Sequence, residues 1–313
     1  MKRWLLLVLV LIALLFISVY IFFPKEVTSS KIEKINCSIN SVNRFILVKD
    51  NWPRWWPGTM SNDVSSNKKS FNYKGINYSI SAERYNSIIV KATSNGLSAE
   101  GTILFVPLNL NTVQAEWVYS LKTNSNPLSR IHLYNETRKI NKNEEDILQN
   151  MKAFLEDPEK VYGLKIGQEI VKDTILVTTK FSASEFPSTS KIYGIIDDLK
   201  SYISNNNAIE TNFPMLHVWQ DSGLFYTTIA IPVDKQISGN DIYSTKRMVP
   251  GKILVAAVKG GPFTAGDAIR RLGIFMTDNQ MSSPAIPFES LITNRMKEPD
   301  TSKWITKIYY PVF

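Results

Sequence analysis

The chain has 313 residues, of which 44% are hydrophobic, and a formal net charge of +8 at pH 7. This length suffices for about two domains with separate cores, and ordinary contents of glycine and proline exclude a fibrous or disordered chain. The basic residues form only short pairs, such as Lys68-Lys69 and Lys246-Arg247. Without a basic stripe or a zinc-finger spacing, nucleic acid is not an expected partner.

Cys37 is the only cysteine, which excludes an intramolecular disulfide and a multi-thiolate metal site. A nucleophilic cysteine needs a partnered base, and neither His132 nor His217 lies in a recognisable motif. Cys37 is therefore expected to be buried and inert. The stretch KGGPFTAGD (259–267) lacks the G-K-[ST] ending of a phosphate loop, which favours a turn leading into a helix. No metal and no cofactor is expected.

The N-terminus suggests a membrane anchor. Residues 4–23 carry no charge and follow the basic pair Lys2-Arg3, and about 20 apolar residues span roughly 30 Å of bilayer. The run ends in bulky residues rather than the small ones of a signal-peptide cleavage site. Residues 1–26 are therefore predicted to form an uncleaved transmembrane helix of a single-pass membrane protein. A short basic head usually stays in the cytoplasm, which would leave the bulk of the chain on the outer, periplasmic or extracellular, side.

Residues 27–166 alternate like the strands of an antiparallel sheet in GINYSISAERY, SIIVKATS, GTILFVPLNLNTVQAEWVYSLKT and RIHLY. The segment KNEEDILQNMKAFLEDPEKVYG then has helical periodicity, so a long closing helix is predicted to cover one face of the sheet. The stretch NWPRWWPGT after SVNRFILVKDN, with QAEWVYSLKT and NPLSR downstream, resembles the START-like, polyketide-cyclase (SRPBCC) superfamily. That resemblance implies a helix-grip fold with a deep apolar cavity. Trp52, Trp55 and Trp56 are expected to cap the core.

Residues 167–313 contain a repeat. FYTTIAIPVD (225–234) recurs as WITKIYYPVF (304–313) when Pro232 is aligned with Pro311. DTILVTTKF resembles GKILVAAVK, with residues 175–177 paired with residues 253–255, and each is followed by a helical pattern and a strand. The duplicated strand–helix–strand–strand unit predicts a pseudo-symmetric domain whose two sheets face each other across a cleft. The predicted fold class is α+β, with domains at 1–26, 27–166 and 167–313.

The stretches VPGKILVAAVKGGPF, PFESLITNR and WITKIYYPV resemble the gyrase-inhibitor-like (GyrI-like) effector-binding domain of bacterial transcription activators, over about residues 168–313. The resemblance implies an aromatic small-molecule pocket between the two halves. Many members carry a glutamate on the last strand that pairs cationic ligands, and some are thought to use it in hydrolysis. Lys307 stands at the matching position, which argues against cationic ligands and weakens a hydrolase function. The sequence shows no helix-turn-helix pattern.

Strand alternation gives eight candidate ligand-binding residues: Tyr193, His217, Trp219, Phe288, Glu289, Trp304, Lys307 and Tyr309. Each aromatic in this set also suits a hydrophobic core. A lysine on the inner face of a cleft is costly unless it is paired or used. Either Glu289 or a ligand should therefore neutralise Lys307, and the cleft should prefer neutral or anionic compounds.

Three functions remain open from the sequence. The favoured prediction is a non-enzymatic, membrane-anchored protein with two modules that bind hydrophobic or amphipathic small molecules. The alternative is a hydrolase acting in the C-terminal cleft, for which Glu289 is the only nearby acid that could serve as a general base. A third possibility is a regulator that faces the cytoplasm and acts through a protein partner without touching DNA.

Overall fold

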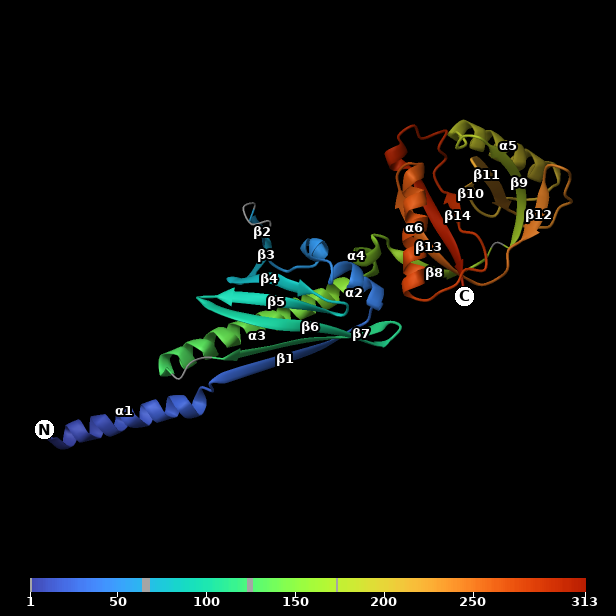
Figure 1. Cartoon of the computed structure of the whole chain (residues 1–313). Coiled ribbons are helices and arrows are strands. Elements are labelled where there is room, and N and C mark those ends of the chain that lie inside the picture. The colour runs from blue at the N-terminus through green and yellow to red at the C-terminus, as the bar shows by residue number, and fades with distance from the viewer. Residues whose placement is uncertain (1, 64–67, 123–125, 173) are drawn as a thin grey trace. The chain divides into compact units, whose positions relative to one another are not determined.

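The computed structural model describes residues 2–63, 68–122, 126–172 and 174–313. The chain divides into two compact units, Met1–Asp157 and Pro158–Phe313 (Figure 1). Each unit is mixed α+β and is built on one curled antiparallel sheet. The units are described separately below as unit 1 and unit 2.

Unit 1 consists of α1 (Lys2–Phe22), β1 (Glu26–Ile35), α2 (Ile39–Phe45), the 3-10 helix η1 (Lys49–Arg54), β2 (Thr59–Asp63), β3 (Lys68–Tyr73), β4 (Ile76–Glu83), β5 (Ser87–Ser94), β6 (Leu97–Asn109), β7 (Thr112–Lys122) and α3 (Pro127–Leu155). Its seven strands are ordered β1-β7-β6-β5-β4-β3-β2. Buried and exposed residues alternate along β7, so one face of the sheet packs inward. Helix α3 covers that face, as the sequence predicts (Figure 1).

Helix α3 begins earlier than the sequence pattern indicates. Its N-cap is Asn126, whose side chain accepts a hydrogen bond of 2.9 Å from the backbone N–H of Leu128, and Pro127 occupies the first turn. The segment RIHLY (130–134), predicted as a strand, is therefore helical. The buried residues Leu133, Thr137 and Ile140 continue the stripe that later includes Ile147 and Leu148. The cap and this stripe outweigh the strand-like alternation of the short segment.

The three clustered tryptophans belong to the core of unit 1, which confirms that prediction. Trp52, Trp55 and Trp56 are buried, and each indole N–H donates to a backbone carbonyl. The rings of Trp52 and Trp56 stack at 5.4 Å. Such hydrogen-bonded aromatic packing fixes the path of the chain between α2 and β2. Cys37 is buried as well.

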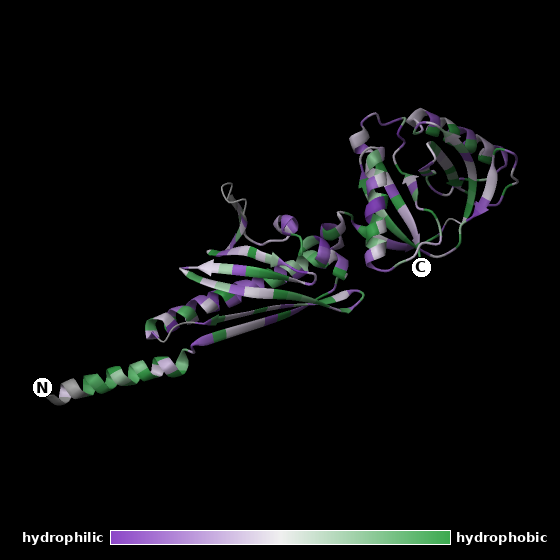
Figure 2. Ribbon diagram, in the orientation of Figure 1, coloured by the Kyte–Doolittle hydropathy of each residue, from purple (hydrophilic) through white to green (hydrophobic). Residues whose placement is uncertain are grey.

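The predicted membrane anchor is not supported. Helix α1 is mostly hydrophobic (Figure 2). Among the described residues, no helix is both long and apolar enough to cross a membrane. This corrects the prediction of a transmembrane helix at residues 4–23 and of single-pass membrane localisation. The end of α1 packs on α3, where the Arg130 guanidinium lies 4.5 Å from the Tyr20 ring.

Unit 2 consists of α4 (Pro158–Tyr162), β8 (Ile166–Ile170), β9 (Ile175–Ala183), α5 (Thr189–Asn205), β10 (Met215–Asp221), β11 (Leu224–Pro232), β12 (Ser244–Arg247), β13 (Lys252–Lys259), α6 (Pro262–Asp278), β14 (Phe288–Leu291), the 3-10 helix η2 (Thr301–Lys303) and β15 (Ile305–Val312). Its eight strands form one sheet, ordered β12-β9-β11-β10-β14-β15-β13-β8. The unit strand–helix–strand–strand occurs twice, as β9-α5-β10-β11 and β13-α6-β14-β15.

The two halves join edge to edge rather than face to face. Strands β10 and β14 pair antiparallel, with Leu216 opposite Glu289, and Glu289 in turn lies opposite Ile308 on β15. Leu216 packs in the core under α5 and Ile308 in the core under α6. Both helices therefore cover the same face of one continuous sheet. The opposite face of this sheet is called here the open face. The prediction of two facing sheets is wrong, because a direct strand pair satisfies the backbone groups at the junction.

The structure also shifts the predicted alignment of the repeats by one residue. Pro232 lies opposite Leu176, whereas Pro311 lies opposite Ile253. Leu176 therefore corresponds to Ile253 rather than to Leu254. A slip of one residue moves a side chain to the other face of a strand, and with this correction Leu176 and Ile253 both lie on the open face.

The edge strands are exchanged between the halves. Strand β8 precedes the first repeat but pairs with β13 of the second, and β12 precedes the second repeat but pairs with β9 of the first. The chain therefore crosses itself where these strands lead into the repeats. Hydrogen bonds of 3.0 Å from Val171 N–H to the Gly251 carbonyl and of 2.8 Å from Met248 N–H to the Thr174 carbonyl join the crossing segments. The sequence repeat gave no sign of this exchange, because β8 and β12 are short and polar.

Candidate functional site

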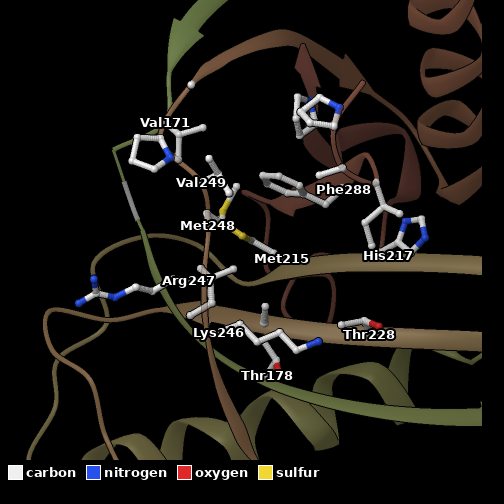
Figure 3. Close-up of a pocket in the computed structure, with 18 of the residues that line it drawn as sticks. Val171, Thr178, Met215, His217, Thr228, Lys246, Arg247, Met248, Val249 and Phe288 are labelled. Carbon is white, nitrogen blue, oxygen red and sulfur yellow. The ribbon is translucent and has the colours of Figure 1, made fainter. Parts of the chain in front are cut away.

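A cavity of about 330 Å³ lies on the open face of unit 2. Strands β9, β10, β11, β12 and β14 contribute to its wall, and residues 248–251 of the crossing segment border it (Figure 3). Residues 311–313 line it from the second half. Its volume falls within the range of small-molecule pockets, about 300–1,000 Å³.

Most of the cavity wall is apolar. Leu176, Met215 and Ala230 form a small buried cluster, against which Met248 and Phe288 pack. These side chains come from five different segments, and strand alternation brings the first three to the same face. Methionine side chains adapt to ligands of irregular shape and make favourable contacts with aromatic rings. The wall thus suits an apolar or flat aromatic group.

Cations line one side of the cavity. Four basic residues contribute to the lining, Lys180, Lys246, Arg247 and Lys252, and none of the described residues around the cavity is an aspartate or glutamate. In Figure 3 the Lys246 side chain extends along the cavity toward Thr228, whereas the Arg247 guanidinium points away from it. Burial and the neighbouring Lys180 lower the pKa of Lys246 below its usual value. Two ammonium groups thus lie near each other without a carboxylate between them.

His217 lies at the far side of the cavity from the crossing segments (Figure 3). Burial lowers the pKa of its imidazole below the usual value, and a hydrogen bond with the Pro287 backbone partly opposes that shift. The ring is therefore neutral at pH 7 and offers one donor and one acceptor. His217 can orient a polar group of a ligand without adding charge.

The eight predicted site residues divide between the two faces of the sheet. His217 and Phe288 line the cavity. Tyr309 stacks on Phe288 with ring centroids 5.2 Å apart and borders a smaller adjoining hollow. Trp219 stacks on Tyr226 at 4.8 Å, in a shallow pocket that shares Lys180 and Thr228 with the cavity.

Lys307 occupies the open face, two residues before Tyr309 on β15 and opposite Ser290. It is not among the residues that line the cavity. Of the two predicted ways of neutralising Lys307, the pair with Glu289 is not formed, because Glu289 lies on the helix-covered face and pairs with Arg295. The sequence therefore indicates a cationic open face, but the structure assigns the charge at the cavity to Lys180 and Lys246.

Tyr193, Glu289 and Trp304 gather around Arg295 on the helix-covered face. Arg295 donates to Glu289 Oε2 at 3.2 Å and to Thr306 Oγ1 at 2.9 Å, and its guanidinium lies 5.0 Å from the Trp304 ring. The Tyr193 hydroxyl accepts a 2.9 Å bond from the Arg295 backbone and donates a 3.0 Å bond to the Thr293 carbonyl. Tyr193 belongs to α5, so this cluster ties the first half to the loop after β14.

Several cavity residues were not anticipated from the sequence. Met215 alternates with His217 and Trp219 on β10, so the alternation that selects those two also selects Met215. Lys246 appears in the sequence only as part of a scattered basic pair. Its place at the cavity depends on the pairing of β12 with β9, which links residues of the two halves. No local sequence pattern predicts the pairing of β12 with β9.

No protein-family model and no curated protein matches the sequence. Among solved structures, the C-terminal domain of EcmrR is similar with a TM-score of 0.42 and 15% identity, covering 48% of this chain and 98% of that one. SAV2435 bound to tetraphenylphosphonium has a TM-score of 0.34 and 15% identity, covering 48% of this chain and 94% of that one. A START superfamily protein from Mycobacterium smegmatis has a TM-score of 0.28 and 12% identity, covering 41% of this chain and 97% of that one.

Proposed function

We propose that this protein binds a hydrophobic or amphipathic small molecule in the open-face cavity of unit 2. The observation that supports this function is the cavity itself, which combines a ligand-sized volume with an apolar wall built from both halves. Its polar lining consists of the four basic residues named above together with Thr178, His217 and Thr228. That combination is typical of small-molecule sites, in which apolar contacts provide affinity and a few polar groups fix orientation.

The hydrolase alternative has no support from Glu289. This carboxylate lies on the helix-covered face in an ion pair with Arg295, away from the cavity. A general base must come within hydrogen-bond reach of the proton that it removes. Among the described cavity residues no other carboxylate takes its place. Binding without turnover is the function that we propose for unit 2.

The same proposal includes a second small-molecule binding module in unit 1. The core of unit 1 contains large, fully buried side chains that include Trp52, Phe71 and Phe105. Glu144 Oε2 is buried in this unit without a hydrogen-bond partner among the described residues. A small polar molecule between sheet and helix would satisfy this group.

Fluorescence titration of the full chain with N-phenyl-1-naphthylamine, a neutral apolar probe, tests the function of unit 2. We expect saturable binding that Phe288→Ala weakens by about tenfold, since the substitution removes an aromatic wall of the cavity. Phe263→Ala serves as the matched control, because Phe263 is exposed on α6 and outside the cavity. Equal binding by both variants, or no saturable binding by the wild type, would contradict the proposed function.

A further inference from the structure

We infer that the ligand of this cavity is an amphipathic organic anion, whose acidic group is held by Lys180 and Lys246 while its apolar body lies on Met215, Met248 and Phe288. This inference rests on the proposed function and adds the chemical class of the ligand. It assigns a binding role to two lysines outside the set selected by the sequence analysis.

The strand register brings the two lysines to the same side of the cavity. Lys180 lies on β9 four residues after Leu176, and Lys246 on β12 lies opposite Leu176. Strand alternation therefore directs both side chains to the open face, together with Thr178. Thr228 lies opposite Lys180 on β11. The polar end of the cavity thus contains two ammonium groups and two hydroxyl groups.

The charge of this end is not balanced within the described part of the chain. Neither Lys180 nor Lys246 forms an ion pair with a described residue, whereas many surface lysines of this protein do, for example Lys200 with Glu210 at 2.7 Å. Two neighbouring ammonium groups repel each other and raise the free energy of the empty site. An anion placed between them removes that repulsion and gains charge-assisted hydrogen bonds. Burial lowers the pKa of Lys246, and the neighbouring charge of Lys180 lowers it further.

The apolar end of the cavity determines the chemical character of the rest of the ligand. The Phe288 ring and the thioethers of Met215 and Met248 face the cavity within reach of one another (Figure 3). Flat aromatic groups pack well against such a wall. A small inorganic anion would contact only the lysine end and leave this wall exposed to water. An aromatic carboxylate fulfils both requirements.

Three naphthalene compounds with different head groups test the assignment on the full chain: 2-naphthoate, 2-naphthylmethanol and 2-naphthylmethylammonium. We expect 2-naphthoate to bind about tenfold or more tightly than the alcohol, and the ammonium compound to bind most weakly, since a charge-assisted hydrogen bond accounts for a tenfold or larger gain. Lys246→Met and Lys180→Met should each reduce 2-naphthoate affinity about tenfold and leave the alcohol within about twofold. Methionine retains the apolar stem without the charge.

Lys191→Met is the matched control, because Lys191 lies on α5 beside Phe181, away from the cavity, and the substitution changes the net charge equally. Its affinity for 2-naphthoate should equal that of the wild type. Equal affinities of the wild type for the acid and the alcohol would refute the anion assignment while leaving the proposed function intact. The anion assignment would also be refuted if Lys191→Met lost as much affinity for 2-naphthoate as Lys246→Met, because an equal loss would reflect the net charge of the protein alone. Failure of all three compounds to bind would overturn the assignment together with the function.

Discussion

The guanidinium of Arg295 and the carboxylate of Glu289 form a buried ion pair, with 3.2 Å between Nη2 and Oε2 and side chains that are only 4% and 13% exposed. Burial raises the pKa of Glu289, and the Arg295 charge opposes that rise. Glu289 stands at the position that Leu216 occupies in the first half, as the β10–β14 register shows. The second repeat thus replaces a core leucine with one member of a buried ion pair, and this difference breaks the symmetry of the two halves.

Arg295→Met should destabilise unit 2 by about 3–5 kcal/mol, because it leaves the Glu289 carboxylate buried without its partner. The double variant Arg295→Met/Glu289→Leu should recover most of that loss, since leucine restores the side chain found at the equivalent position of the first half. Urea unfolding of the full chain, followed by circular dichroism, measures both. Binding of 2-naphthylmethanol by the double variant should match the wild type. A single variant as stable as the wild type would show that the pair contributes nothing to the fold.

The affinity for 2-naphthoate should fall as the pH rises from 7.5 toward 10. The pKa of Lys246 is lowered, so its ammonium loses the proton at a lower pH than an ordinary lysine, and the attraction for the carboxylate weakens. The other charged groups that line the cavity are Lys180, Arg247 and Lys252, and His217 is neutral throughout this range. Titrations at several pH values measure the trend. The affinity of Lys246→Met should vary less with pH, and 2-naphthylmethanol should show no trend.

The stability of unit 1 should fall with rising pH because of Glu144. Burial raises the pKa of this carboxyl to about 9, so the folded state retains a proton that the unfolded state loses near pH 4.5. Between these two pKa values the free energy of unfolding decreases by at most about 1.4 kcal/mol per pH unit. Glu144→Gln should remove this dependence.

Scanning calorimetry of the full chain from pH 5.5 to 8.5 measures the effect of Glu144. The transition of unit 1 is identified as the one that Leu148→Ala lowers, because Leu148 is buried under the sheet. Glu145→Gln is the control, since Glu145 lies on the same helix but forms only an exposed pair with Lys31. If wild type and Glu144→Gln show the same pH dependence, the buried carboxyl does not control the stability of unit 1.

That residues 27–166 and 167–313 fold independently of each other remains a prediction. The structure suggests a comparison of two fragments of unit 2 that begin at different residues. The Tyr162 hydroxyl donates to Asp278 at 2.8 Å, and Leu164 packs in the core under α6. A fragment of residues 158–313 retains these contacts, whereas 167–313 loses them. We expect the longer fragment to be more stable by about 1–3 kcal/mol. Urea unfolding of both fragments measures the difference, and equal stability would show that α4 and the start of β8 are dispensable.

The sequence alone determined the strand–helix–strand–strand elements that occur twice in unit 2, although Glu289 and Trp304, which it assigned to the cleft, lie on the helix-covered face. The duplicated unit follows from periodicity, and periodicity is local, because each side chain's face depends on its neighbours along the same strand. His217 and Phe288 were found at the cavity in this way. The long helix of unit 1 was predicted on the same grounds, although the strand assigned to RIHLY overlooked the helix cap at Asn126.

Only the tertiary structure decided which strands are neighbours, and the composition of the candidate site depends on that choice. The β10–β14 pair merges the halves into one sheet and turns Glu289 toward Arg295, and the exchange of β8 and β12 brings Lys246 to the cavity. These pairings join residues tens of positions apart, and their free energy comes from backbone hydrogen bonds and core packing that no local pattern encodes. For this reason the charge expected from Lys307 is supplied at the cavity by Lys180 and Lys246.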